Sequence, residues 1–270
     1  MKRICIIVLT VATLMIAVRS QAARKYRTLD QWKGRIVAFL GDSMTDERHI
    51  GTSKNYWQYL DEMLGIRPVV YGVNGHQWTG VMQQAAELAR SGREVDAIVI
   101  FAGTNDFNAG VPIGRWYDTE LCEVKVAGGR TERRQKRTPN MDAGTFCGRI
   151  NGVLSFLKDA FPETQIILLT PIHRAYARFS ENNVQPDESY VNSAGLFFDE
   201  YVDAVRQASG IWSVPVLDLN GSCGLYPLCR QHERYFNDAE TDMLHPNSLG
   251  HYRIAKTLMY MMLALPADFR

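Results

Sequence analysis

The sequence predicts an α/β fold in which helices cover both faces of a parallel sheet. Short apolar runs, typical of fully buried strands, alternate along the chain with segments that carry apolar residues at helical spacing. Polar clusters directly follow three of these runs, at the end of a parallel sheet where ligands bind. The 270 residues, 46% of them hydrophobic, are enough for one large domain with a full core.

The predicted elements follow one another in a regular order. In the first half they are a strand at 35–40, a helix at 56–64, a strand at 68–72, a helix at 80–90 and a strand at 96–101. In the second half they are a helix at 143–161, a strand at 165–169, a helix at 196–205, a strand at 214–218 and a helix at 249–263. No internal repeat or low-complexity linker interrupts this order, so residues 23–270 are predicted to form a single domain.

Residues 107–146 are predicted to form an insertion in this domain, because the alternation does not explain them. A Gly128-Gly129 turn beside a strand-like segment favours a hairpin on the site side of the sheet. The basic run from Arg130 to Arg137 is interpreted as a solvated face, with an anion site as the alternative. The insertion is expected to shape the access of substrate.

The first 22 residues are predicted to be a secretory signal peptide. Lys2 and Arg3 precede an apolar stretch at 4–18, and small residues follow at 20–22. A membrane anchor is the alternative, but the stretch is shorter than the roughly 20 residues that cross a bilayer. The protein is therefore expected to be secreted or periplasmic, with no membrane span once the peptide is removed.

The charge of the mature chain argues against a nucleic-acid partner. Removal of residues 1–22 takes away three basic residues and no acidic ones, which changes 30 basic and 29 acidic residues to 27 and 29, a net charge of −2. A nucleic-acid-binding domain would be expected to carry a strongly basic face.

Four cysteines remain after the signal peptide: Cys122, Cys147, Cys223 and Cys229. An even number in an exported protein is compatible with two disulfides. Of the three connectivities, the local one is expected, which pairs Cys122 with Cys147 and Cys223 with Cys229. Four reduced, buried cysteines are the alternative.

Three residues could carry out nucleophilic catalysis. Ser43 follows the first predicted strand in a glycine-containing turn, where its hydroxyl could attack an acyl group. His245 is the candidate base, and Asp242, three residues earlier, could hold its ring and stabilise the imidazolium. Alternatively, Ser43 is an ordinary turn residue and His245 lies at the N-terminus of the last helix.

Acyl transfer also needs donors for the oxyanion that forms on the carbonyl oxygen. Asn105, in Gly103-Thr104-Asn105-Asp106 after the third strand, could donate from its side-chain amide. The backbone amides of Ser43 and Gly75 could complete this oxyanion hole. All the residue types of the Asn105 segment also favour plain turns.

These segments together resemble the SGNH (GDSL-type) hydrolases. The resemblance rests on Ser43 in Gly-Asp-Ser-Met-Thr, Gly75 in Gly-Val-Asn-Gly, Asn105 in Gly-Thr-Asn-Asp, and His245 in Asp-Met-Leu-His-Pro-Asn-Ser-Leu-Gly. It implies a three-layer α/β/α, flavodoxin-like fold with a five-stranded parallel sheet. It also implies a serine nucleophile with a His–Asp pair and no metal or cofactor.

A metal site is disfavoured independently of the resemblance. The six histidines show no His-Glu-x-x-His spacing, although Asp242 and His245 could in principle ligate a metal ion. Candidate substrate contacts are His76 and Trp78 near the rim of the cleft and Trp116 in the insertion. The two tryptophan rings could stack on a sugar, although ordinary packing is the alternative for each.

The most favoured function is an exported serine esterase that removes acetyl groups from a carbohydrate, so that its substrate is a small-molecule or polysaccharide ester. A periplasmic lysophospholipase or thioesterase that acts on longer acyl chains is the alternative enzyme. An inactive hydrolase fold that binds carbohydrate is the alternative from another class, and the complete set of Ser, Asn, Asp and His argues against it.

Overall fold

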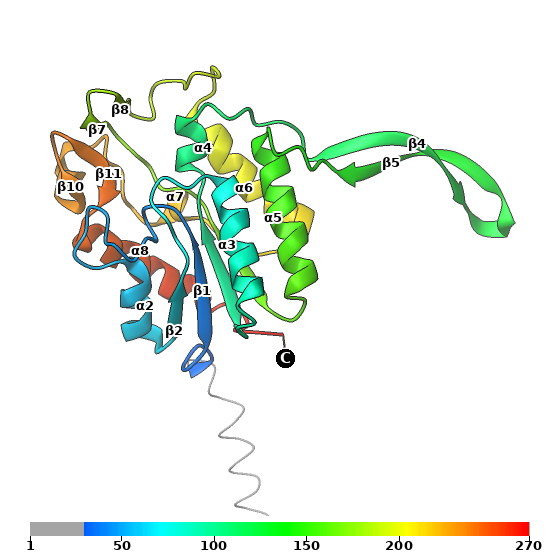
Figure 1. Cartoon of the computed structure of the whole chain (residues 1–270), viewed down its shortest axis with the longest axis horizontal. Coiled ribbons are helices and arrows are strands. Elements are labelled where there is room, and N and C mark those ends of the chain that lie inside the picture. The colour runs from blue at the N-terminus through cyan, green and yellow to red at the C-terminus, as the bar shows by residue number, and fades with distance from the viewer. Residues whose placement is uncertain (1–29, 270) are drawn as a thin grey trace, which may run out of the picture.

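Five parallel strands form the central sheet of the computed structural model, which describes residues 30–269 (Figure 1). In spatial order they are β2 (Arg67–Val70), β1 (Ile36–Gly41), β3 (Ala97–Phe101), β6 (Gln165–Leu169) and β9 (Val216–Leu217). The predicted parallel sheet is thus confirmed. Its edge strand β9 is shorter than predicted, and the preceding Pro215 has no amide hydrogen to donate to a ladder.

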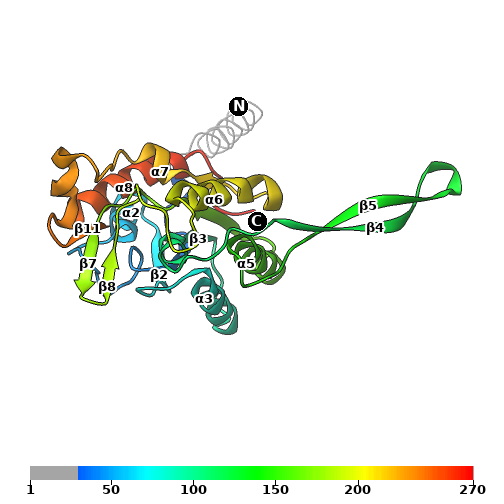
Figure 2. The ribbon, with the colours of Figure 1, turned by 90° about the horizontal axis from the view of Figure 1, so that it is seen from above.

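Helices cover both faces of the sheet, as predicted. On one face lie α3 (Trp78–Arg90), α5 (Phe146–Ala160) and α6 (Phe198–Trp212), and on the other lie α2 (Tyr56–Leu64), α7 (Leu219–Ser222) and α8 (Ser248–Met262). Ala38 and Leu40 pack into the first core, whereas Val37 and Phe39, which alternate with them, pack into the second. Full burial of each large apolar side chain stabilises the fold by about 1.5–3 kcal/mol. Figure 2 shows the resulting three layers from above.

Two helices end or begin at other residues than predicted, and the residues that flank them explain these differences. Helix α5 begins at Phe146 rather than at 143, because the Thr145 hydroxyl accepts a hydrogen bond from the amide of Gly148 at 3.3 Å and caps the first turn. Helix α6 extends to Trp212, beyond the predicted end at 205, and the left-handed backbone of Ser213 follows it.

A second, small antiparallel sheet was not predicted. It consists of β10 (Phe236–Asp238), β11 (Asp242–Pro246), β7 (Ala177–Ser180) and β8 (Asn183–Gln185), in that order. A 3₁₀ helix, η3 (Arg230–Tyr235), precedes β10. The small sheet lies near the carboxyl ends of the main strands, at the upper left of Figure 1.

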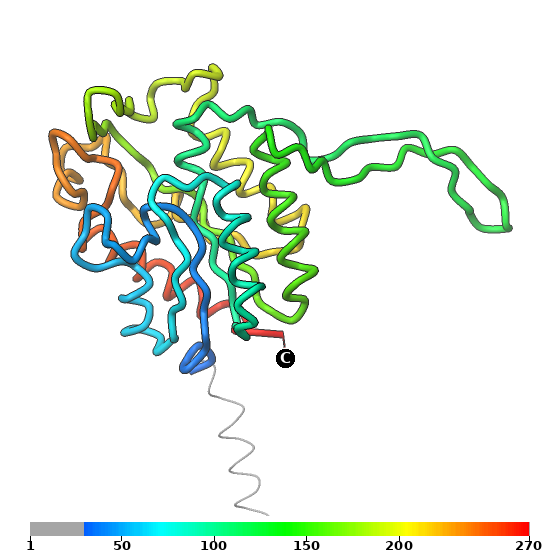
Figure 3. Tube along the Cα trace, viewed as in Figure 1, coloured from blue at the N-terminus to red at the C-terminus, as the bar shows by residue number. Residues whose placement is uncertain are grey.

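The segment between β3 and α5 contains the short helix α4 (Thr104–Asn108) and a long hairpin. The hairpin consists of β4 (Tyr117–Lys125), the turn η2 (Ala127–Gly129) and β5 (Thr131–Pro139), and we call residues 117–139 the arm. Figures 1 and 2 both show the arm projecting away from the rest of the molecule, and Figure 3 shows the same along the Cα trace.

Hydrogen bonds hold the root of the arm against the helices. The side-chain amide of Asn151 in α5 donates to the carbonyl oxygens of Trp116 and Asn140 at 2.9 and 2.8 Å. The indole N–H of Trp212 donates in turn to the Asn151 side-chain oxygen at 2.8 Å. The root is therefore fixed while the strands beyond it are mostly exposed.

The expected disulfides are wrong, because all four cysteines are free. Cys122 lies in the projecting arm, whereas Cys147 is buried in α5, and a disulfide needs Cα atoms within about 7 Å. Cys223 is buried after α7, and the thiol of Cys229 donates to the Gln231 side chain at 3.0 Å. An even number of cysteines therefore did not indicate that they are paired in the fold.

The predicted signal peptide, residues 1–22, lies outside the described residues. Between residues 30 and 269, the structure contains no helix that is long and apolar enough to cross a membrane.

Candidate active site

Ser43 lies in the turn that follows β1, an inner strand of the main sheet. Gly41, at the end of this strand, has a φ of 156°, and a Cβ atom there would lie 2.2 Å from the carbonyl oxygen of Phe101. Only glycine therefore permits this close approach of β1 to β3. The side chain of Gln84 accepts from the Gly41 amide and donates to the Gly41 carbonyl, both at 2.8 Å. A single side chain thus holds both backbone polar groups of Gly41, directly before the turn that presents Ser43.

A continuous chain of hydrogen bonds joins Ser43, His245 and Asp242. The Nε2 atom of His245 lies 2.9 Å from the Ser43 hydroxyl, and its Nδ1 atom lies 3.0 Å from both carboxylate oxygens of Asp242. All three side chains are buried, with Ser43 only 6% exposed. Strand β11 carries both the histidine and the aspartate, so a single element sets their relative positions.

Asp242 is held in its charged form. Burial alone would raise the pKa of Asp242. The hydrogen bonds from His245 and Asn237 and the charge of His245 outweigh burial, so the pKa lies below its ordinary value. The Asn237 amide donates to Oδ2 at 2.9 Å, and the His245 backbone amide donates to Oδ1 at 3.0 Å. A carboxylate supported in this way can orient the imidazole and stabilise its positive charge.

The structure also brings the other two predicted segments to this end of the sheet. The Asn105 side-chain amide donates to the carbonyl oxygen of His76 at 3.1 Å and to Asp42 Oδ2 at 3.4 Å. Gly75, with a φ of 81°, lies in the turn directly before His76. The amide of Asn74 donates to the Asp46 carboxylate at 2.7 Å, which holds this turn against the segment that follows Ser43.

Two buried carboxyl groups, those of Asp42 and Asp106, lie beside the residues of the candidate site. Burial raises the pKa of Asp42 to about 7, although the amide of Met44 donates to it at 3.1 Å. Burial likewise raises the pKa of Asp106 to about 6, even though Asp106 forms an ion pair with Arg149 at 2.8 Å. Asp106 also accepts from the Trp78 backbone amide at 3.1 Å, so it joins α4 to the starts of α3 and α5.

Of the three predicted substrate contacts, only His76 lies with the candidate site. Its ring contacts the Gln84 side chain at 2.9 Å, and its carbonyl oxygen accepts from Asn105. Trp78 is 1% exposed and packs edge-on against Phe146, with ring centroids 6.4 Å apart, so its ring is not on a cleft rim. Trp116 lies at the root of the arm, where its indole N–H donates to Gln207 at 2.9 Å.

The sequence did not indicate three residues that support the site. Asn237 supports Asp242 from the preceding strand β10, and Gln84 joins Gly41 to His76 from α3. The ring of Phe179 in β7 lies beside the ring of His245, with centroids 5.4 Å apart. No local pattern marks these residues: Gln84 and Phe179 are distant in the sequence from Gly41 and His245, and Asn237 meets Asp242 only because β10 and β11 pair.

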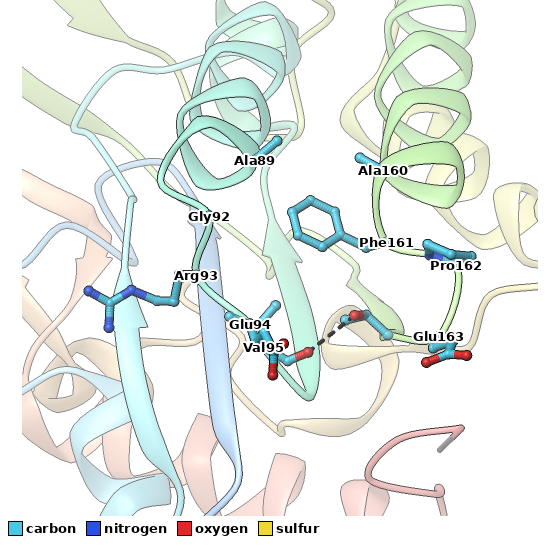
Figure 4. Close-up of a pocket in the computed structure, with 10 residues that line it drawn as sticks. Ala89, Gly92, Arg93, Glu94, Val95, Ala160, Phe161, Pro162 and Glu163 are labelled. Carbon is cyan, nitrogen blue, oxygen red and sulfur yellow. Dashed lines mark hydrogen bonds between the residues drawn. The ribbon is translucent and has the colours of Figure 1, made fainter.

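A pocket of about 350 Å³ occurs at the other end of the sheet, between the C-terminal ends of α3 and α5 (Figure 4). Its lining includes Ala89, Val95, Phe161 and Pro162, which lie at the end of the sheet opposite to Ser43. It is therefore separate from the candidate site.

Comparison with known proteins places the chain in a family. The model of the GDSL-like lipase/acylhydrolase family matches residues 39–253. No curated protein is significantly similar to the chain.

Solved structures share the fold at low sequence identity. A protein from Lactobacillus plantarum is 22% identical with a TM-score of 0.66, over 86% of this chain and 98% of that one. A possible lipase from Chitinophaga pinensis is 22% identical with a TM-score of 0.61, over 84% of this chain and 97% of that one. An acetyl xylan esterase is 16% identical with a TM-score of 0.51, over 84% of this chain and 98% of that one. The family match spans most of the chain, and its fold is that of solved GDSL and SGNH proteins, so the chain belongs to the GDSL-like lipase/acylhydrolase family.

Proposed function

We propose that the protein is an exported serine esterase that hydrolyses carboxylic esters, most favourably the acetyl esters of a carbohydrate. The observation that carries this proposal is the unbroken chain from the Ser43 hydroxyl through His245 to Asp242, with contacts of 2.9 and 3.0 Å. This is the geometry that a nucleophilic serine requires. Export rests on the predicted signal peptide at residues 1–22.

In the proposed mechanism, the Ser43 oxygen attacks the ester carbonyl carbon while its proton passes to Nε2 of His245. Asp242 stabilises the imidazolium that forms. When the tetrahedral intermediate collapses, the bond to the alcohol breaks, and His245 returns the proton to the leaving oxygen. His245 then takes a proton from a water molecule that attacks the acyl-serine. When the bond between the acyl carbon and the Ser43 oxygen breaks, His245 returns this proton to Ser43, and the acid is released.

The oxyanion would accept from the backbone amides of Ser43 and Gly75 and from the side-chain amide of Asn105. Asn105 makes a shorter bond to His76, at 3.1 Å, than to Asp42, at 3.4 Å. The bond to His76 would hold the amide in place, and the second hydrogen would turn from Asp42 to the oxyanion. Loss of such a donor typically costs about 2.7–4 kcal/mol of transition-state stabilisation.

A second candidate function is hydrolysis of longer acyl chains, as in a lysophospholipase or thioesterase. Phe179, 44% exposed beside His245, favours it, because this ring could contact an alkyl chain near the reacting carbonyl. Rates on 4-nitrophenyl esters from acetate to octanoate would distinguish the two enzymes. A preference for octanoate would contradict deacetylation.

The decisive experiment replaces the nucleophile. We expect Ser43→Ala to lower kcat by about 10⁴-fold or more on 4-nitrophenyl acetate. Acetate release from acetylated xylan, pectin and peptidoglycan should disappear as well. Ser155→Ala, in the middle of α5, is the matched control and should retain activity. Equal activity of the wild type and Ser43→Ala would refute hydrolysis through Ser43, and the absence of activity in both proteins would favour an inactive binding fold.

A further inference from the structure

We propose that a second pocket, between α4 and the β7–β8 hairpin, binds the leaving group of the substrate. This leaving group is a neutral sugar, rich in hydroxyl groups. The proposal rests on the proposed esterase function. The pocket has a volume of about 350 Å³, and five side-chain amides line it, from Asn108, Asn182, Asn183, Gln185 and Asn192. We call it the amide pocket. Its volume is within the range of small-molecule sites.

The walls of the amide pocket are elements that also build the candidate active site. Asn108 follows Asn105 by three residues on α4, about one helical turn. Gln185 in β8 is opposite Ala177 of β7, and Ala177 is opposite Asp242 of β11. A ligand in this pocket would therefore be held by the same elements that position the oxyanion donor and the carboxylate.

A buried arginine fixes the orientation of the amides. The guanidinium of Arg174, which has no exposed surface, donates to the side-chain oxygen of Asn108 and to that of Gln185 at 3.1 Å. The Asn108 amide nitrogen also donates to the Gln185 oxygen at 2.7 Å, and the Gln185 nitrogen donates to the Asn183 oxygen at 3.1 Å. The side-chain oxygens of Asn108, Asn183 and Gln185 thus all accept hydrogen bonds within this network.

This arrangement favours an oxygen-rich ligand. Each amide nitrogen carries two hydrogens, and in Asn108 and Gln185 one of them is used within the network. The second hydrogens can donate to hydroxyl or acetal oxygens without reorganisation of the wall. Tyr190, also in the lining, is 64% exposed and offers a flat ring on which a sugar could stack.

The charge of the lining favours a neutral ligand. Among the described residues that line the amide pocket, Asp187 is the one charged side chain. A carboxylate at this position would repel the phosphate of a lysophospholipid headgroup. Arg174 is fully buried behind the amides and does not line the pocket. The lining therefore suits a sugar better than an anionic headgroup.

The test compares two substrates that share an acetyl group but differ in the leaving group, acetylated xylo-oligosaccharides and 4-nitrophenyl acetate. Asn183 and Tyr190 are exposed, so Asn183→Ala and Tyr190→Ala should fold normally. We expect each variant to lower kcat/KM about fivefold on the oligosaccharide and less than about twofold on the nitrophenyl ester.

Two matched control variants replace residues of helices that do not line the amide pocket. Gln83→Ala removes an exposed amide from α3, and Tyr260→Ala removes a tyrosine from α8 that is 63% exposed, close to the value for Tyr190. Both controls should match the wild type on both substrates.

The outcomes separate this inference from the proposed function. If the wild type shows no Ser43-dependent hydrolysis of 4-nitrophenyl acetate, the esterase function fails. If it does, but the pocket variants behave like the controls or lose activity equally on both substrates, the amide pocket is not a leaving-group site. A larger loss on lysophosphatidylcholine than on the oligosaccharide would overturn the choice of a sugar.

Discussion

Two hairpins follow strands of the main sheet at the same end of the molecule, but only one of them borders the candidate site. The arm is the longer, with two strands of nine residues each, and it projects into solvent (Figure 1). The β7–β8 hairpin has strands of four and three residues, yet it pairs with β11 and places Phe179 beside His245. The length of an insertion therefore did not indicate which hairpin borders the site.

The two hairpins also differ in how their strands are stabilised. In the β7–β8 hairpin, Ala177 is fully buried and its neighbours bond to Thr241 and Met243 on either side of Asp242. The strands of the arm pair only with each other along their length, in a nine-residue register. An isolated two-stranded ribbon is marginally stable in water. Substitutions in the short hairpin should consequently affect the site, whereas those in the arm should not.

The largest effect is expected from a charge placed between β7 and β11. Ala177→Asp would bury a carboxylate opposite Asp242, which should lower the free energy of unfolding by about 4 kcal/mol or more and kcat/KM more than about 100-fold. Urea denaturation and hydrolysis of 4-nitrophenyl acetate measure the two quantities. Thr119→Asp, at an exposed position of the arm opposite Arg137, is the control and should change neither. Equal losses in both variants would refute the contrast.

A smaller effect is expected on the pH dependence of the free energy of unfolding. The folded pKa of Asp42 is about 7 against an ordinary 3.8, so between these values the folded protein retains a proton that the unfolded chain releases. The free energy of unfolding that Asp42 contributes therefore falls as pH rises, by about 2–3 kcal/mol from pH 5 to pH 8. Asp42→Asn removes this titration, so its stability relative to the wild type should improve over that range.

Asp118 in the arm provides the comparison for this measurement. Hydrogen bonds from Asn140 and Arg115 hold its pKa below the ordinary value, so it stays charged from pH 5 to pH 8. Asp118→Asn should therefore show a constant difference from the wild type across the range. A constant difference for Asp42→Asn as well would mean that Asp42 is already charged at pH 5 in the folded protein.

The next effect compares two asparagines that each donate to an aspartate. Asn237→Ala removes the 2.9 Å bond to Asp242 and should lower kcat about tenfold, because the charge that stabilises the imidazolium is less well held. Asn140→Ala removes bonds of 3.1 and 3.0 Å to Asp118 at the root of the arm. Its kcat should stay within about twofold of the wild type. The reverse order would show that the arm, not β10, supports catalysis.

The smallest effect is expected from removal of the arm. Tyr117 and Pro139 are paired across its base, so two glycines can join them in place of residues 118–138. Values of kcat/KM on 4-nitrophenyl acetate and on acetylated xylo-oligosaccharides should both stay within about twofold of the wild type. A tenfold loss on the oligosaccharide alone would show that the arm contacts the substrate.

The main sheet could be predicted because its signals are local. Runs such as 36–41 and 97–101 are almost wholly buried, and a continuous apolar run indicates this environment without knowledge of its neighbours. The segments of Ser43 and Asn105 follow these two strands, and that of Gly75 follows the partly buried β2, so their place in the fold could be inferred with the sheet.

The small sheet could not be predicted, because its strands are three to five residues of mixed polarity and most of their partners are distant in the sequence. Ala177 and Asp242 are paired across 65 positions, and no alternation in either segment indicates this. The surroundings of Trp78 and Trp116 could not be predicted for a related reason. Each is an aromatic residue near a strand end or in an insertion, and only tertiary packing shows that one is buried and the other joins the arm to α6.

The division of the site between two sheets has a consequence for heating. Ser43 follows the main sheet, whereas His245 and Asp242 lie in β11, which has short pairings with β7 and β10. A region with few pairings opens at lower free energy than a buried central sheet. Warming should therefore separate the base from the nucleophile while the main sheet is intact, so that thermal inactivation precedes melting and is reversed on cooling.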